Sequence, residues 1–158
     1  MSVMNIESSY NKNSSSPIAG LGRRKLILSV DDDSSVLYAR YKLLSSMGYG
    51  VISANDGIQA LQIFGSTPVD LVLLDYSMPF LDGGQVAEAM KEYKPNVPII
   101  LVSGADVPEK FLALVNGCVR KGEGPEALLT AITELMQSSV GSRLVAEVEH
   151  LNEAAIWP

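Results

Sequence analysis

Cysteine and long apolar runs are both scarce in this sequence, and each scarcity excludes a class of protein. The chain of 158 residues contains one cysteine, Cys118, so it cannot form an internal disulfide or a cysteine-based zinc site. No apolar run approaches the roughly 18 residues that suggest a membrane-spanning helix. Residues 1–20 also lack the apolar segment of a secretory signal. We therefore expect a soluble cytoplasmic protein with no membrane partner.

Positive charge is in deficit as well. Lys and Arg number 12 against 18 Asp and Glu, which gives a net charge of −6. This balance argues against a broad nucleic-acid-binding surface. Hydrophobic residues make up 47% of the chain, which is enough for a sizeable core. The length favours one domain with tails.

Composition and apolar periodicity divide the chain into three parts. Residues 1–23 are rich in Ser, Asn and Gly and lack periodicity, so we predict a disordered tail. Residues 24–137 carry the pattern of a folded domain. Residues 138–158 form an extension in which 143–155 favours a further helix, with an apolar stripe at Leu144, Val148 and Leu151. That stripe would dock on the domain or on a partner, which leaves a homodimer open.

The middle part alternates short apolar runs with segments of helical spacing. Strands are expected at 25–30, 50–54, 69–74, 97–102 and 118–121, and helices at 34–47, 57–64, 84–93, 108–115 and 125–136. Alternating strands and helices imply an α/β fold with a doubly wound parallel sheet. In such sheets the functional crevice lies at the carboxyl ends of the strands.

Polar residues follow four of the five expected strands. They are Asp31, Asp32 and Asp33 after the first strand, Asp75 after the third, Ser103 after the fourth and Lys121 at the end of the fifth. Carboxylates beside a lysine suit Mg²⁺. Asp75 could be a metal ligand and also a nucleophile that forms an acyl phosphate. Lys121 would then spread the charge of the transferring phosphoryl group, and Ser103 could donate a hydrogen bond to it.

Five segments together resemble the receiver domain of response regulators over about residues 24–137. They are "LILSVDDD", "GYGVISANDGIQAL", "DLVLLDYSMPFLDG", "VPIILVSGA" and "VRK". The resemblance implies a five-stranded, flavodoxin-like (βα)₅ fold. It also implies a histidine kinase or a histidine phosphotransfer protein as the phosphate donor.

The resemblance further assigns a role to each site residue. Asp75 is the phosphoacceptor, Asp31 and Asp32 are the acidic pair around the metal, the backbone carbonyl of Ser77 completes the metal sphere, Ser103 is the switch hydroxyl and Lys121 binds the phosphoryl group. Asp33 is better read as an N-cap, or as a group that contacts the metal ligands, than as a ligand itself. Gly83, which ends "MPFLDG", is expected to supply a permissive backbone for the turn.

Two positions depart from the family pattern. Gly122 stands where the family usually has Pro, often after a cis bond. A cis bond before a non-proline residue costs about 2.5–4 kcal/mol, so we predict a trans bond or a rearranged loop. Cys118, three residues before the lysine, stands where the family often has an aromatic residue, and we expect a buried small hydrophobe there.

The resulting hypothesis is a single-domain response regulator that is phosphorylated on Asp75. About 20 residues follow the last domain helix, too few for a DNA-binding domain, so output is expected through a downstream protein target and not through direct nucleic-acid contact. The protein would assist its own phosphorylation and the hydrolysis of its own phosphoryl group, and it would not be an enzyme that acts on a separate metabolite. The alternative is a pseudo-receiver, an interaction module that is never phosphorylated. An aspartyl phosphatase or nucleotide-binding enzyme is disfavoured because the corresponding motifs are missing.

Overall fold

A computed structural model of the protein describes residues 22–138 and contains one five-stranded parallel sheet. The strands are β1 (Leu26–Val30), β2 (Gly50–Ala54), β3 (Leu71–Asp75), β4 (Ile99–Ser103) and β5 (Gly117–Arg120). Their order in the sheet is β2-β1-β3-β4-β5, and every neighbouring pair is parallel. The predicted doubly wound fold is confirmed.

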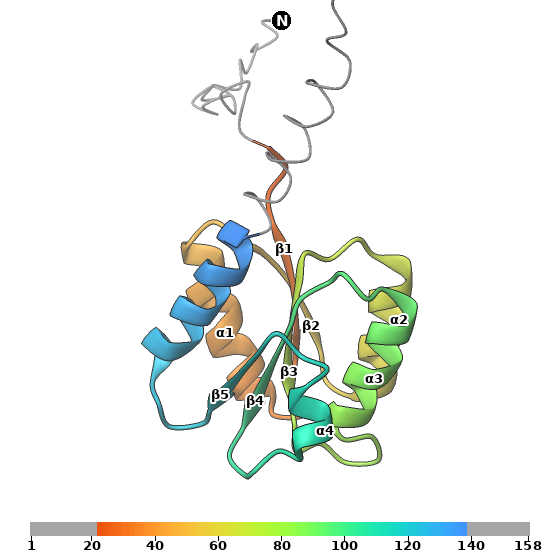
Figure 1. Cartoon of the computed structure of the whole chain (residues 1–158). Helices are drawn as coiled ribbons and strands as arrows, with labels where there is room; N and C mark the ends of the chain where they lie inside the picture. The colour runs from red at the N-terminus through yellow and green to blue at the C-terminus, as the bar shows by residue number, and fades with distance from the viewer. Residues whose placement is uncertain (1–21, 139–158) are drawn as a thin grey trace, which may run out of the picture.

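Helices cover both faces of the sheet (Figure 1). They are α1 (Ser34–Ser46), α2 (Gly57–Ser66), α3 (Gly83–Tyr93) and the single turn α4 (Glu109–Leu112), followed by helical residues 125–138. Figure 1 shows α1 and helix 125–138 on one face, and α2 and α3 on the other. The chain thus forms three layers, with the sheet in the middle.

The central strand β3 is buried along its whole length. Leu71 and Leu73 pack into a cluster with Ile132 of helix 125–138, whereas Leu74 packs into a second cluster with Met90 of α3. Successive side chains of a strand point to opposite faces, so a strand between two helical layers needs apolar residues at nearly every position. This explains why "LVLL" runs directly into an acid.

Two expectations about α4 and β5 are wrong. The helix expected over 108–115 is one turn, Glu109–Leu112, and Cys118 is exposed instead of buried. Val119 packs toward helix 125–138, so Cys118 points to the opposite face of the edge strand. The short α4 does not cover it there.

The predictions for the chain ends fall almost entirely outside the described residues. These are the disordered tail over 1–23 and the extension over 138–158 with its apolar stripe. Within residues 22–138, none of the helices combines the length and the apolar character needed to cross a bilayer.

Candidate functional site

Three acids meet at the carboxyl end of the sheet. Asp31 follows β1, Asp75 ends the neighbouring β3, and the register pairs Val30 with Leu74. One carboxylate oxygen from each of Asp31, Asp32 and Asp75 lies within 4.8 Å of the others. Asp31 and Asp75 are fully buried, whereas Asp32 is exposed. The structure therefore brings together the acids that the sequence placed at one edge.

Lys121 reaches into this cluster from the loop after β5. Its Nζ lies 2.9 Å from Oδ1 of Asp75 and 3.9 Å from Oδ2 of Asp31. Its backbone N–H donates to the carbonyl of Ser103 at 2.8 Å, which fixes the base of the side chain beside β4. The Lys121 side chain is 42% exposed. Its ammonium can therefore move to contact a group that binds from solvent.

Ser103 ends β4 with a buried hydroxyl. The hydroxyl donates to the carbonyl of Ala105 at 2.7 Å and accepts from the N–H of the same residue at 3.1 Å. It is thus turned into its own loop. It can donate a hydrogen bond elsewhere only after leaving the Ala105 carbonyl.

Asp33 lies beside the acid cluster, but it acts as a helix cap. Its side chain accepts from the N–H of Ser35 at 2.8 Å at the start of α1. The hydrogen bonds to Ser35 lower the pKa of Asp33. Of the two roles predicted for Asp33, the structure shows the N-cap.

The buried position of Asp75 makes its charge costly. Burial raises the pKa of the Asp75 carboxyl and Asp31 adds to the rise, while Lys121 opposes both. Within residues 22–138, both carboxylate oxygens of Asp75 are buried without a hydrogen bond of normal geometry, although Lys121 and the backbone N–H of Ser77 are near enough to lower the pKa of Asp75. A buried charged oxygen without a partner calls for a cation or a donor.

The donor set fits Mg²⁺, which takes one or two carboxylates and keeps several waters. Asp31, Asp32 and Asp75 supply hard oxygen atoms, and Asp32 opens the cluster to solvent. Ser77 is also exposed, two residues beyond Asp75. The metal-binding role of the Ser77 carbonyl stays a prediction.

Arg40 is a site residue that the sequence analysis missed. It lies on α1, is buried, and places Nη2 3.2 Å from Oδ2 of Asp31. Burial lowers the pKa of Arg40, and Asp31 opposes this effect. The signal was a charge within an apolar stripe, because the buried residues of α1 are Leu37, Arg40 and Leu44.

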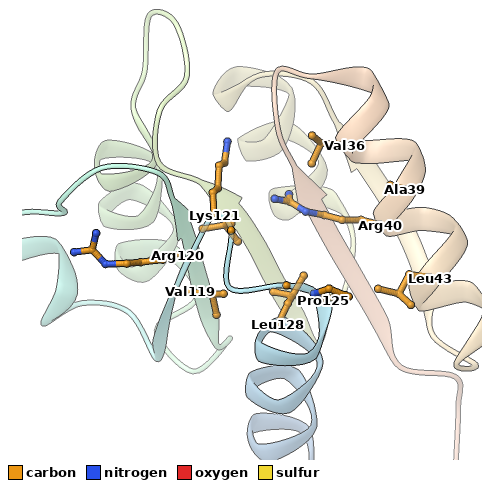
Figure 2. A pocket seen from close by; sticks show the side chains of 12 residues that line it. Val36, Ala39, Arg40, Leu43, Val119, Arg120, Lys121, Pro125 and Leu128 are labelled. Carbon is orange, nitrogen blue, oxygen red and sulfur yellow. The ribbon is translucent and has the colours of Figure 1, made fainter.

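A cavity of about 380 Å³ lies beside Arg40, between α1 and the start of helix 125–138. Figure 2 shows the Arg40 side chain extending from α1 toward the loop that carries Lys121. Gly122 and Gly124 line the cavity and contribute no side chain to fill it. Both have positive φ, 102° and 85°. No cis peptide bond occurs in residues 22–138, so the predicted trans bond before Gly122 is confirmed.

The conformation of Gly122 leads to a first prediction. Gly122→Ala should lower the free energy of unfolding by about 1–2 kcal/mol, because a Cβ disfavours left-handed backbone. Gly122→Pro should cost more, since Pro holds φ near −65°. Urea unfolding measures both. Gly104→Ala is the control, because its added Cβ meets only ordinary contacts with Lys121. A Gly122→Pro variant as stable as wild type would contradict this prediction.

Comparison with known proteins gives one consistent family. A model described as the response regulator receiver domain matches residues 27–133. Response regulator MprA of Mycobacterium leprae is 35% identical over 115 residues, which are 70% of this chain and 50% of MprA. A CheY-like receiver domain protein from Methanospirillum hungatei has a TM-score of 0.71 at 27% identity, covering 75% of this chain and 99% of that one.

A third match is to the response regulator protein TrrA from Thermotoga maritima, solved in complex with Mg(2+)-BeF. Its TM-score is 0.67 at 29% identity, covering 70% of this chain and 98% of that one. Since the family model matches more than half of the chain, this protein belongs to the response regulator receiver domain family. The chain spans about half the length of MprA.

Proposed function

We propose that this protein is a phosphoacceptor in a histidine-to-aspartate phosphorelay, with Asp75 as the modified residue. One observation carries the proposal. A buried carboxylate at a strand end has an ammonium 2.9 Å from one oxygen, two further carboxylates within 4.8 Å, and no hydrogen-bond partner within residues 22–138 for its other oxygen. This arrangement provides a nucleophile together with groups that handle phosphoryl charge.

The proposed transfer is a simple displacement at phosphorus. A carboxylate oxygen of Asp75 attacks the phosphorus of a phosphohistidine, the new P–O bond forms, and the P–N bond breaks with its electron pair going to the imidazole nitrogen. Lys121 Nζ, already beside Asp75, pairs with the phosphoryl oxygens. Mg²⁺ held by Asp31, Asp32, Asp75 and the Ser77 carbonyl would neutralise part of the developing charge.

Ser103 would convert this chemistry into a change of surface. Its hydroxyl donates to the Ala105 carbonyl in the unmodified protein. A phosphoryl oxygen is a stronger, charged acceptor, so the hydroxyl would exchange partners and draw in the loop after β4. The exposed Cys118 lies on the next strand. It replaces the usual aromatic residue, so the output face would differ from that of relatives with an aromatic side chain there.

The proposed donor is a histidine kinase or a histidine phosphotransfer protein. TrrA has also been solved in complex with the histidine kinase ThkA, at 29% identity to this chain and a TM-score of 0.66. We further propose that the protein works as a single-domain regulator, acts on a downstream protein, and turns over no substrate other than its own phosphoryl group. Its net charge of −6 argues against direct nucleic-acid binding.

The test is phosphorylation with a small donor. With acetyl phosphate and Mg²⁺, the intact mass should rise by one phosphate, and the Asp75→Asn variant should show no rise. Asp82→Asn is the matched control, because Asp82 is an N-cap of α3 and Asn caps nearly as well as Asp. If neither acetyl phosphate nor beryllofluoride changes the folded wild-type protein, the pseudo-receiver alternative holds.

A further inference from the structure

Arg40 lies behind the acid cluster, and the proposed phosphoryl transfer does not require it. Its exposure is 7%, and Nη2 lies 3.2 Å from Oδ2 of Asp31. The other oxygen of Asp31, Oδ1, accepts from the N–H of Asp33 at 3.0 Å. Oδ1 is therefore held by a hydrogen bond, whereas Oδ2 is paired with Arg40 by charge alone and has no hydrogen bond within residues 22–138.

The formal charges of the site show what this pairing does. Three carboxylates face two cations, Arg40 and Lys121, which leaves one excess negative charge. A divalent cation would turn that into one excess positive charge. Without Arg40, the same cation would leave the site neutral. Phosphorylation replaces the single charge of Asp75 with roughly two negative charges, and only then do the metal and Arg40 together balance the site.

We propose that Arg40 is a positioning residue that serves as the internal counter-ion of Asp31 and thereby weakens divalent-cation binding until Asp75 is phosphorylated. The inference rests on the metal-assisted phosphorylation proposed above. Two effects act in the same direction. Arg40 repels a cation across a poorly solvated distance. It also stabilises the buried Asp31 carboxylate in the metal-free protein. A metal ion that binds Asp31 therefore gains less free energy, because the cost of burying that charge is already partly offset.

The ion pair between Arg40 and Asp31 is also incompletely hydrogen-bonded, so a metal ion can compete with it for Asp31. Nη1 of Arg40 is buried without a hydrogen-bond partner in the part of the chain that the structure describes. A buried donor left unpaired reduces the net stabilisation that such an ion pair provides. The metal therefore competes with an ion pair that is not fully satisfied.

Calorimetric titration of the full chain with MgCl₂ and MnCl₂ tests the inference. Arg40→Met keeps much of the apolar stem of the side chain and removes the charge. The dissociation constant of this variant for the divalent cation should be about tenfold lower than that of wild type. Arg40→Lys, which restores the charge, should stay within about threefold of wild type. Arg23→Met is the matched control, because Arg23 pairs with Asp70, just before β3 and so at the opposite end of that strand from Asp75. Its affinity should not change.

Beryllofluoride adds a second readout. Mg²⁺ affinity should rise more with beryllofluoride in wild type than in Arg40→Met. If Arg40→Met does not fold, Arg40→Gln gives the same comparison. Equal or weaker metal binding in the uncharged variants, with clear binding in wild type, would overturn the role of Arg40 alone. If neither wild type nor the variants bind metal, the metal-assisted function fails as well.

Discussion

Asp75→Asn is expected to make the metal-free protein more stable while removing its phosphorylation. Asp75 is fully buried, and neither of its oxygens has a satisfactory hydrogen bond within residues 22–138, although Lys121 lies 2.9 Å away. A neutral amide of the same shape is less costly to bury than a carboxylate. Lys121 is partly exposed and lies 3.9 Å from Asp31, so it keeps both water and a partner. In EDTA at pH 7, the variant should gain about 1–2 kcal/mol.

The pH dependence of this difference has a defined sign. Burial is the largest cause of the raised pKa of Asp75, so the folded protein holds the Asp75 proton more tightly than the unfolded chain does. The penalty for the ionised form is complete above the folded pKa, shrinks as the pH falls through that pKa, and is absent below the unfolded pKa. The advantage of Asp75→Asn should therefore be largest near neutral pH and decline on acidification.

Metal should reverse the order of stability. Wild type has three carboxylates for a cation and the variant has two, so saturating MgCl₂ should stabilise wild type more. Thermal unfolding with EDTA and with MgCl₂ gives the four values needed. Asp82→Asn should follow wild type under both conditions. If the Asp75→Asn variant is less stable than wild type in EDTA, the buried carboxylate of Asp75 does not lower the stability of the metal-free protein.

The sheet edge and most of the site were predictable from the sequence. Apolar runs identified all five strands, and parallel topology places their carboxyl ends at one edge, so the gathering of Asp31, Asp75 and Lys121 at that edge was expected before their strand order was known. Two boundaries were displaced by two residues. β3 and β4 begin at Leu71 and Ile99 and include Asp75 and Ser103 as their last residues, because apolar character alone does not show where pairing begins.

The features that were missed depend on three-dimensional packing. Arg40 occupies a core position of α1, and its partner lies nine residues earlier on a different element. Helical spacing placed the apolar stripe at Leu37, Tyr41 and Leu44, so it neither put position 40 in the core nor identified the acid that compensates the charge. The exposure of Cys118 depends on the length of α4, which a segment of only a few apolar residues leaves undetermined.

Gly83 shows the same limit, since its predicted role was only partly right. It begins α3 directly after the N-cap Asp82, but its φ is not among the positive values, so backbone freedom is not the reason for glycine. The reason is a close approach. A Cβ there would lie 2.4 Å from the carbonyl oxygen of Asp75 and 2.8 Å from Cα of Tyr76. The N–H of Gly83 donates to the Tyr76 carbonyl at 2.8 Å, so the helix cannot move away without losing that bond.

Gly83→Ala should therefore be the most destabilising small substitution near the site, with a loss of about 3 kcal/mol in the free energy of unfolding. The contacts are with backbone atoms, which cannot rotate aside as a side chain can. Displacing the Asp75 carbonyl should also slow phosphorylation by acetyl phosphate. Gly65→Ala on α2 is the control, because a Cβ there meets open space and alanine favours a helix by up to about 1 kcal/mol. Urea unfolding should move the two variants in opposite directions, and equal midpoints would mean that α3 can shift away from β3 without cost.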